Sequence, residues 1–165
     1  MRKVWGKKEA VSPVIAVILM VAITVVLAAV LYIMVSGMIT TTTTSPHVTL
    51  SNWVKDSATS GHIDIADVDQ TKPCSDYKFI VIKGSDTITV STGPSTAGGK
   101  SNQTGSISGT SVTVTVTDLT GEGKLSGGDR ITISTTAAAL PSGDWELKVI
   151  YIPTGDEVGR ISWTI

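Results

Sequence analysis

Apolar and polar residues follow two different patterns along this chain. From Val14 to Val35 only Thr24 and Tyr32 carry polar side-chain groups, so 22 consecutive positions are almost uniformly apolar. From residue 46 onward, short stretches of alternating apolar and polar residues are separated by Gly, Ser and Asp. A continuous apolar run of this length predicts a membrane-type helix, whereas alternation predicts half-buried strands.

The apolar run has the length of a bilayer core. At about 1.5 Å per residue, its helix would span about 33 Å. A helix is expected because a single segment in lipid must satisfy its own backbone hydrogen bonds. Ser12-Pro13 is a start signal, with Ser as N-cap and Pro in the first helical turn. Small residues let neighbouring helices approach closely, and we expect that role for Ala16, Ala22, Ala28 and Ala29.

The second part of the chain predicts about eight short strands. Seven are specified by their pattern, at 62–68, 78–83, 87–90, 111–117, 130–134, 145–152 and 159–165. The expected fold class is therefore α+β, a long N-terminal hydrophobic helix followed by an all-β antiparallel sandwich or Greek-key head. We place Trp53, Trp145 and Trp163 in the core of the head, because aromatic residues at alternating spacing are more often core than a carbohydrate-stacking platform.

The stretch 91–110 contains almost no large apolar residues, which predicts a long mobile loop. Within it, Asn102-Gln103-Thr104 is an N-glycosylation sequon, so Asn102 is a candidate glycosylation site.

Charge is uneven along the chain and predicts its orientation. Arg2, Lys3, Lys7 and Lys8 precede the apolar run with Glu9 as the only acid, and no further charge occurs before Lys55. Such a basic leader is expected to stay cytoplasmic, with the head outside. From residue 46 onward, nine Lys and Arg and thirteen Asp and Glu give a net charge of −4, which argues against nucleic acid as a partner.

Three interpretations of the N-terminus remain open from hydropathy and charge. A cleaved secretory signal has a shorter apolar core of about 7–15 residues with its cleavage site behind it. A permanent single-span anchor fits the length and charge. The third is a peptidase site ahead of the helix, since the charged cluster Lys7-Lys8-Glu9 ends in the small residue Ala10 and is followed by Val11-Ser12-Pro13.

The stretch "KEAVSPVIAVILMVAITVVLAAVL" resembles the N-terminal segment of archaeal type IV pilins. The resemblance implies a class III signal peptide, cut by a prepilin peptidase between Ala10 and Val11. It divides the chain into a leader (1–10), an assembly helix (11–39), a Thr-rich linker (40–46) and an extracellular head (47–165). Ala10 and Ile15 stand where the bacterial branch of the family typically has Gly and Glu.

The same resemblance implies the partners and the location of the protein. They are copies of the chain itself in a homopolymeric filament, the prepilin peptidase, and an assembly ATPase with its membrane platform protein. The precursor is expected in the cell membrane and the assembled protein in a surface pilus that serves adhesion. A membrane-anchored binding domain and a minor pilin or pseudopilin are the alternatives.

One acidic, Gly-rich stretch has the spacing of a calcium-binding loop. In "DLTGEGKLSGGD" the ligands would be Asp118, Thr120, Glu122 and Asp129, with the carbonyl of Lys124, which resembles an EF-hand or dockerin loop. Thr and Glu at the third and fifth positions and a closing Asp depart from that pattern. An ordinary connection between strands is the favoured interpretation, so no cofactor is expected.

No sequence motif indicates an enzyme. The chain has no nucleophile elbow, P-loop or metalloprotease motif, and Cys74, as the single cysteine, excludes an intramolecular disulfide. His47, His62 and the group Asp64, Asp67 and Asp69 are interpreted as ordinary strand and loop residues.

Overall fold

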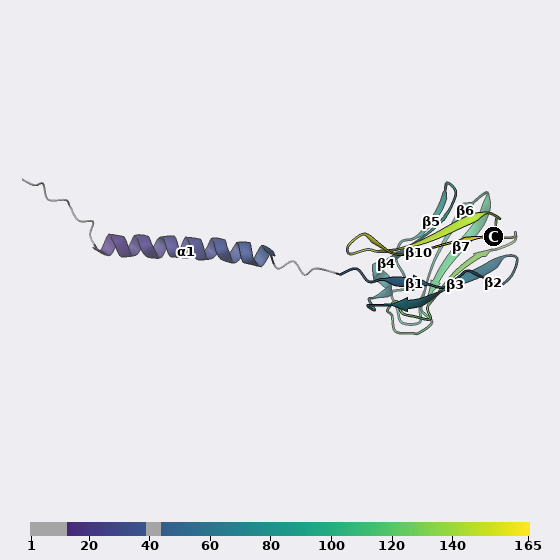
Figure 1. The fold of residues 1–165 in the computed structure, drawn as a ribbon, viewed down its shortest axis with the longest axis horizontal. Coiled ribbons are helices and arrows are strands. Elements are labelled where there is room, and N and C mark those ends of the chain that lie inside the picture. The colour runs from purple at the N-terminus through teal and green to yellow at the C-terminus, as the bar shows by residue number, and fades with distance from the viewer. Residues whose placement is uncertain (1–12, 39–43) are drawn as a thin grey trace, which may run out of the picture. The chain divides into compact units, whose positions relative to one another are not determined.

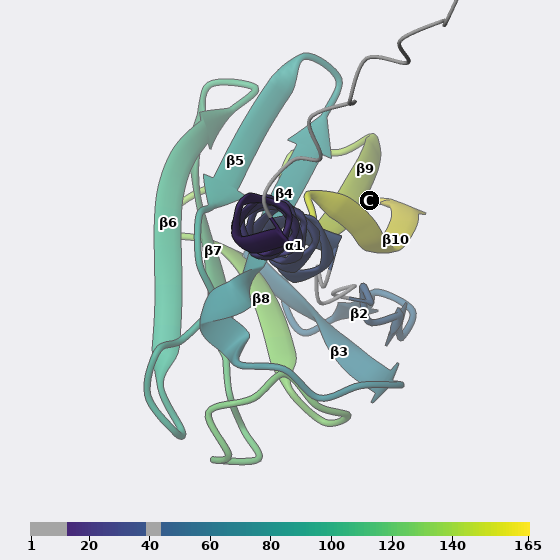
Figure 2. The same ribbon diagram turned by 90° about the vertical axis from the view of Figure 1, so that its left-hand side faces the viewer.

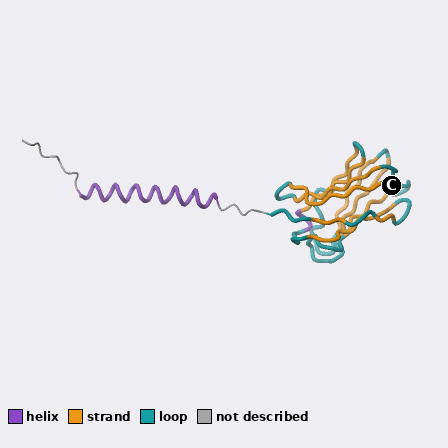
Figure 3. The backbone as a smooth tube through the Cα atoms, in the orientation of Figure 1, coloured by secondary structure: helices purple, strands orange, loops and turns teal. Residues whose placement is uncertain are grey.

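The computed structural model describes residues 13–38 and 44–165. The chain divides into two compact units, residues 1–42 and 43–165. The first contains the single helix α1 (Pro13–Met38), and the second, here called the head, contains all ten strands of the described residues (Figure 1). Figure 3 shows the same division between helix and strands. The expected fold class, a long apolar helix followed by antiparallel sheets, is confirmed.

Helix α1 starts where the sequence predicts. Pro13 is its first residue, and the helix continues for 26 residues. Pro13 is tolerated there because the first N–H groups of a helix have no partner within the helix. The Thr24 hydroxyl donates a 2.9 Å hydrogen bond to the Val21 carbonyl, so the polar group inside the run is satisfied by the helix itself.

The head contains two antiparallel sheets that share one core. The first sheet has the order β1-β3-β8-β7-β6, with β2 also paired to β3. Its strands are β1 (Val48–Leu50), β2 (Val54–Lys55), β3 (Ser60–Val68), β6 (Lys100–Ile107), β7 (Thr110–Thr117) and β8 (Arg130–Thr135).

The second sheet has the order β10-β9-β4-β5. Its strands are β4 (Tyr77–Lys83), β5 (Asp86–Val90), β9 (Asp144–Tyr151) and β10 (Asp156–Thr164). A short 3-10 helix (Cys74–Asp76) precedes β4. Figure 2 shows the two rows of strands, with β10 at the end of the second row.

Alternation in the sequence matches burial in the head. Val112, Val114 and Val116 of β7 are buried, and so are Leu147 and Val149 of β9. The intervening residues of both strands face outward. Every buried apolar side chain of the core cluster comes from residues 48–158. The head therefore has a core of its own, to which α1 contributes no side chain among the described residues.

The expectation of a mobile loop over 91–110 is wrong for residues 100–107, which form β6. The strand is polar, but it pairs with β7 along its full length, from Lys100 opposite Thr117 to Ile107 opposite Thr110. Gly105 gives Ile88 room to pack, because a Cβ there would lie 2.7 Å from Ile88 Cγ1. Backbone pairing and close packing, rather than apolar side chains, therefore account for this strand.

The tryptophans confirm the core expectation only in part. Trp145 is 1% exposed and belongs to the core, whereas Trp53 and Trp163 are half-buried and pack against it. The three rings form a stack, with centroids 5.1 Å apart for Trp53 and Trp163 and 6.1 Å apart for Trp163 and Trp145. The stack lies between the β1–β2 edge of one sheet and β10 of the other, two edges that no strand pairing connects.

The chain is fixed to the head from Ser45 onward. The Ser45 hydroxyl donates a 2.5 Å hydrogen bond to Asp156 Oδ2 in the β9–β10 hairpin. The His47 backbone N–H donates to Asp69 Oδ1 at 2.7 Å, and its ring Nδ1 lies 3.2 Å from the Val158 carbonyl. We call these contacts of Ser45 and His47 the collar. They connect the segment before β1 to both sheets.

Candidate functional site

The side chains of α1 are apolar and exposed around the whole helix. Large apolar residues from Val14 to Val35 are 52–75% exposed, and the most apolar 18 residues within Pro13–Ser36 have a mean hydropathy of 3.2 with none of them buried. By length and composition this helix can cross a membrane. A helix that is apolar all round fits lipid or the centre of a bundle, and water suits it poorly.

Four alanines interrupt the large side chains of α1. Ala22 and Ala29 are seven residues apart and share one face of the helix, whereas Ala16 and Ala28 lie on other faces. A groove of about 270 Å³ is lined by Ala22 with Ile23, Val26 and Leu27. This groove is a recess at one of the four alanines, and the packing of neighbouring helices against all four stays a prediction.

The predicted cleavage site lies outside the described residues. This applies to Ala10 and Val11, and to the leader charges Lys7, Lys8 and Glu9.

The candidate calcium loop is held by hydrogen bonds to a buried carboxylate. Asp118 is 2% exposed and accepts backbone N–H bonds from Gly121 (2.7 Å), Gly123 (2.7 Å) and Gly98 (3.0 Å). Gly121 and Gly123 have φ values of 73° and 70°, a region that favours glycine. Burial alone would raise the pKa of Asp118, but these donors and the Thr120 hydroxyl lower it to about 2.

The closing residue of the loop, Asp129, is also fully buried and also accepts N–H bonds. Its donors are Ser126 (2.9 Å), Leu119 (3.1 Å) and Thr120 (3.3 Å). Both carboxylates therefore already have internal partners, while Glu122 is exposed.

The hydrogen bonds of this loop argue against a calcium site. A cation would have to displace backbone N–H groups that point at the carboxylate oxygens of Asp118 and Asp129. Within residues 13–38 and 44–165, no group of three or more His, Cys, Asp or Glu side chains could hold a metal ion. The hydrogen bonds support the interpretation of residues 118–129 as a turn organised around two carboxylates, and calcium binding there stays an untested prediction.

Asn102 lies on strand β6 and not in a loop. Its side chain is exposed, and the residue pairs with Thr115 of β7, whose side chain faces outward from the core. The Thr104 hydroxyl, the third position of the sequon, is 2.8 Å from the Thr113 hydroxyl. The sequon is thus accessible on the surface of the folded head.

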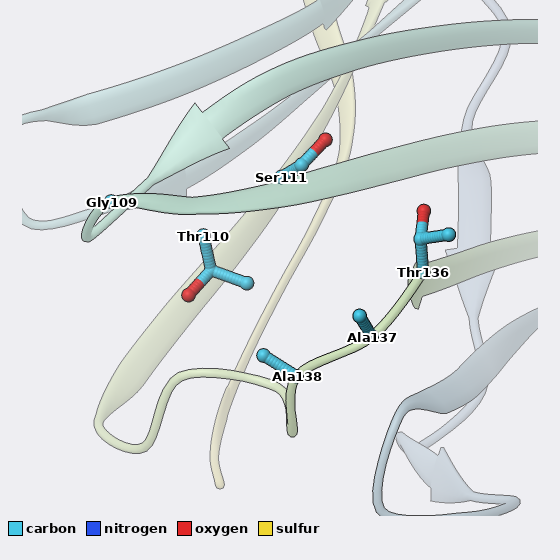
Figure 4. A pocket seen from close by; sticks show the side chains of 6 residues that line it. All are labelled: Gly109, Thr110, Ser111, Thr136, Ala137 and Ala138. Atoms are coloured by element: carbon cyan, nitrogen blue, oxygen red, sulfur yellow. The ribbon is translucent and has the colours of Figure 1, made fainter.

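A shallow pocket of about 230 Å³ lies between the β6–β7 turn and the segment after β8 (Figure 4). In Figure 4 the Thr110 side chain and the Ala137 and Ala138 methyl groups approach one another from the two segments. Its lining residues are Gly109, Thr110, Ser111, Thr136, Ala137 and Ala138. It is lined by no titratable side chain, so it offers no general acid, general base or metal ligand.

The sequence analysis missed one polar network. Arg130 donates to Asp64 through Nε (2.6 Å) and Nη2 (3.1 Å), and this pairing holds the pKa of Asp64 below its ordinary value. His62 is 9% exposed, with Nδ1 2.8 Å from Asp56 Oδ2. The register that places Asp64 opposite Arg130 joins strands far apart in sequence. No local sequence pattern therefore predicts this ion pair.

No curated protein sequence matches this chain. A family model described as archaeal type IV pilin, N-terminal, matches residues 9–50. The match covers residues 9–12 ahead of α1, the whole helix, the linker and β1. It confirms the resemblance read from the apolar run and supports a type IV pilin subunit, from a structural family rather than an enzyme family. Residues 9–50 are therefore similar to the N-terminal region of archaeal type IV pilins.

Proposed function

We propose that this chain is the precursor of a filament subunit, with α1 in the filament centre and the head on the outside. The exposure of α1 on every side carries the proposal. Its large side chains are 52–75% exposed, although they are of the same types that are buried in the head. Burying apolar area contributes about 25 cal/mol per Å². A helix that buries none of it among residues 13–38 and 44–165 therefore needs lipid or other copies around it.

Transfer from lipid to a helix bundle exchanges one apolar environment for another, so packing at Ala16, Ala22, Ala28 and Ala29 would favour association. The basic leader behaves differently. Each Lys or Arg moved into a dry filament centre would cost several kcal/mol unless it were paired. Removal of residues 1–10 by a prepilin peptidase therefore has a physical reason. An assembly ATPase and its platform protein would then move the helix out of the membrane.

Mass spectrometry of the mature N-terminus tests the proposal. A protein that starts at Val11 and is recovered in sheared surface filaments supports it. An intact leader supports a single-span anchor, and a start beyond residue 30 supports ordinary secretion.

The test variant for this measurement carries Lys7→Ala and Lys8→Ala in the leader. The matched control carries Lys55→Ala and Lys72→Ala in the head. We expect only the first pair to block maturation. Normal processing and assembly of that pair would contradict the cleavage assignment.

The proposed role of the exposed head is surface adhesion. The residues that line the pocket of Figure 4 present hydroxyl and methyl groups without charge. Such a surface suits neutral partners, because it has no unpaired charge to desolvate on contact. Filaments with Thr110→Lys should lose adhesion while Lys78→Thr filaments keep it, measured as cells retained on a surface. Equal retention would exclude this part of the head as the adhesive surface.

Asn102 is a proposed N-glycosylation site of the head. Its exposure on β6 makes it accessible, and a glycan there would shield the outer surface of the first sheet. Intact-mass measurement should show the same loss of mass in Asn102→Gln and Thr104→Ala. Thr104→Ser keeps the sequon and should keep the glycan. An unchanged mass in all three would show that the site is unmodified.

A further inference from the structure

Strand β10 presents an unpaired backbone edge in its C-terminal half. Gly143 and Ile165 exchange two backbone hydrogen bonds, of 2.9 and 3.0 Å, across the β9–β10 pair. Such hydrogen-bonded pairs alternate along an antiparallel ladder. Every second pair back from Ile165 is therefore also hydrogen-bonded, namely Trp163 with Trp145 and Ile161 with Leu147. It follows that the N–H and C=O groups of Arg160, Ser162 and Thr164 point away from β9.

These outward groups have no partner among residues 44–165. β10 pairs only with β9, and no backbone bond outside the strand ladders involves these three residues. Their side chains are exposed. The N-terminal half of the edge is covered by β1, because a Cβ at Gly159 would lie 2.8 Å from the Val48 carbonyl oxygen. The open part of the edge is therefore 160–164.

The other edges of the head are protected in ways that β10 is not. β1 has three residues and a register shift between Thr49 and Leu50, and β2 has two residues and includes Lys55. β5 and β6 face each other, where the Ser108 N–H donates to Asp86 and the Ser101 hydroxyl to the Thr92 carbonyl, both at 2.7 Å. Short strands, bulges, charges and coverage are the usual protections of sheet edges. Residues 161–165 contain no charged side chain, Pro or Gly.

We propose that this edge pairs with the same edge of a second copy of the chain, antiparallel and centred on Ser162. In that register Ser162 lies opposite itself, Arg160 opposite Thr164, and Ile161 opposite Trp163. The three outward residues of each copy would form about six backbone hydrogen bonds. No like charges meet, since the only charged residue, Arg160, lies opposite a Thr and is paired within its own copy to Glu157 at 2.6 Å. On the inner face Ile161 lies opposite Trp163, an apolar contact that a one-residue slip would lose.

The geometry indicates which copies meet. A two-fold contact uses the same patch on both partners, whereas the repeating contact of a helical filament is heterologous. The β10 contact is therefore separate from the contacts that build one filament. If the chain forms filaments, as proposed above, it joins heads of neighbouring filaments side by side. The pairing of isolated heads does not depend on that condition.

Association of the head alone, residues 44–165, tests the pairing. The head is suitable because it has its own core. Strand addition over five residues is a small contact, so we expect a reversible dimer in the micromolar to millimolar range by sedimentation velocity. Ser162→Pro removes an outward N–H and no ladder bond, and should weaken the dimer at least about tenfold. Ser162→Ala keeps the N–H and should leave it unchanged. A head that stays monomeric at millimolar concentration, or equal association of both variants, would overturn the proposal.

Cross-linking gives a second measurement that does not depend on how proline is tolerated. Opposed residues of a hydrogen-bonded pair have Cα atoms about 5.5 Å apart, within the range of a disulfide. Ser162→Cys should therefore dimerise covalently when diamide oxidises the two thiols. Glu146→Cys, one strand further in, would place its sulfurs about 14 Å apart and should not. Cys74 does not compete, because it is 1% exposed and burial raises its pKa to about 12. Equal cross-linking of both variants would contradict the register.

Electron microscopy of filaments tests the consequence. Wild-type and Ser162→Ala filaments should associate laterally, and Ser162→Pro filaments should remain single. If heads dimerise in solution but no filaments form, the edge pairing stands and the proposed function fails. If filaments of all three proteins bundle alike, edge pairing does not join them.

Discussion

Helix α1 and the head are built from the same apolar residue types but complete their packing in opposite ways. In α1 the large apolar side chains are 52–75% exposed, whereas those of the head core are 0–8% exposed. The apolar side chains of the head pack against one another between its two sheets. The helix has no such packing partners in the described part of its own chain. An apolar residue therefore stabilises the fold of this protein only in the head, and in the helix it determines which surroundings the protein can occupy.

A charge in the helix should give the largest effect. Ala22→Lys places an ammonium group in the middle of α1, at a cost of about 2.5–3.5 kcal/mol for membrane insertion. We expect complete loss of surface filaments, measured in sheared fractions, with an unchanged melting temperature of the head. Ser106→Lys on exposed β6 is the matched control and should assemble normally. Normal filaments of Ala22→Lys would mean that α1 is not surrounded by apolar groups.

Truncation of a core residue should act only on the head. Leu147 is fully buried in β9, so Leu147→Ala should lower the free energy of unfolding by about 2–5 kcal/mol. Urea denaturation followed by tryptophan fluorescence measures this change. The same truncation at Leu27, which is 56% exposed in α1, should leave the head transition in place. A shift of similar size for both variants would show that the two units fold together.

The buried carboxylate of Asp118 should make the head sensitive to acid. Its pKa is lowered from 3.8 to about 2, so the ionised form stabilises the fold above about pH 4. That stabilisation, about 2 kcal/mol, should be lost as the pH falls from about 4 to 2. Asp118→Asn should remove most of it at pH 7 and flatten the pH dependence of the melting temperature in that window. Asp67→Asn, at an exposed position, should do neither.

Calcium should have the smallest effect. Since the oxygens of Asp118 and Asp129 already accept N–H bonds, millimolar calcium should leave the melting temperature of the head unchanged. A ligand that bound the folded state would raise it by mass action. A rise that is absent in Asp118→Asn would restore the calcium-loop hypothesis for residues 118–129.

Local pattern predicted most of the strands and the start of the helix. Strands β7, β8 and β9 follow directly from alternation, as at Val112, Val114 and Val116. β6 was missed because its stability comes from backbone pairing with β7 and from the absence of a side chain at Gly105, neither of which has a hydrophobic signature. β1 and β2 are too short to carry a period.

The candidate sites depended on information of two kinds. The long apolar helix α1 follows from composition, so the sequence was enough to predict it. The loop at 118–129 has residue types and spacing typical of a calcium site. Whether it can bind calcium depends on where the N–H groups of Gly121 and Gly123 point. The ion pair of Asp64 with Arg130 depends on how distant strands are aligned in the sheet, that is, on their register. The free edge of β10 depends on strand register in the same way. Register is set by the whole fold and cannot be read from one segment.

The collar has a mechanical consequence. Tension applied to the chain ahead of Ser45 reaches the contacts of Ser45 and His47 before it reaches β1. Those contacts end on Asp156 at the start of β10 and on Asp69 directly after β3, so the load is divided between two anchor points. Only after these contacts break would the force act on the hydrogen bonds between β1 and β3. The short strand β1 therefore does not carry the full force alone.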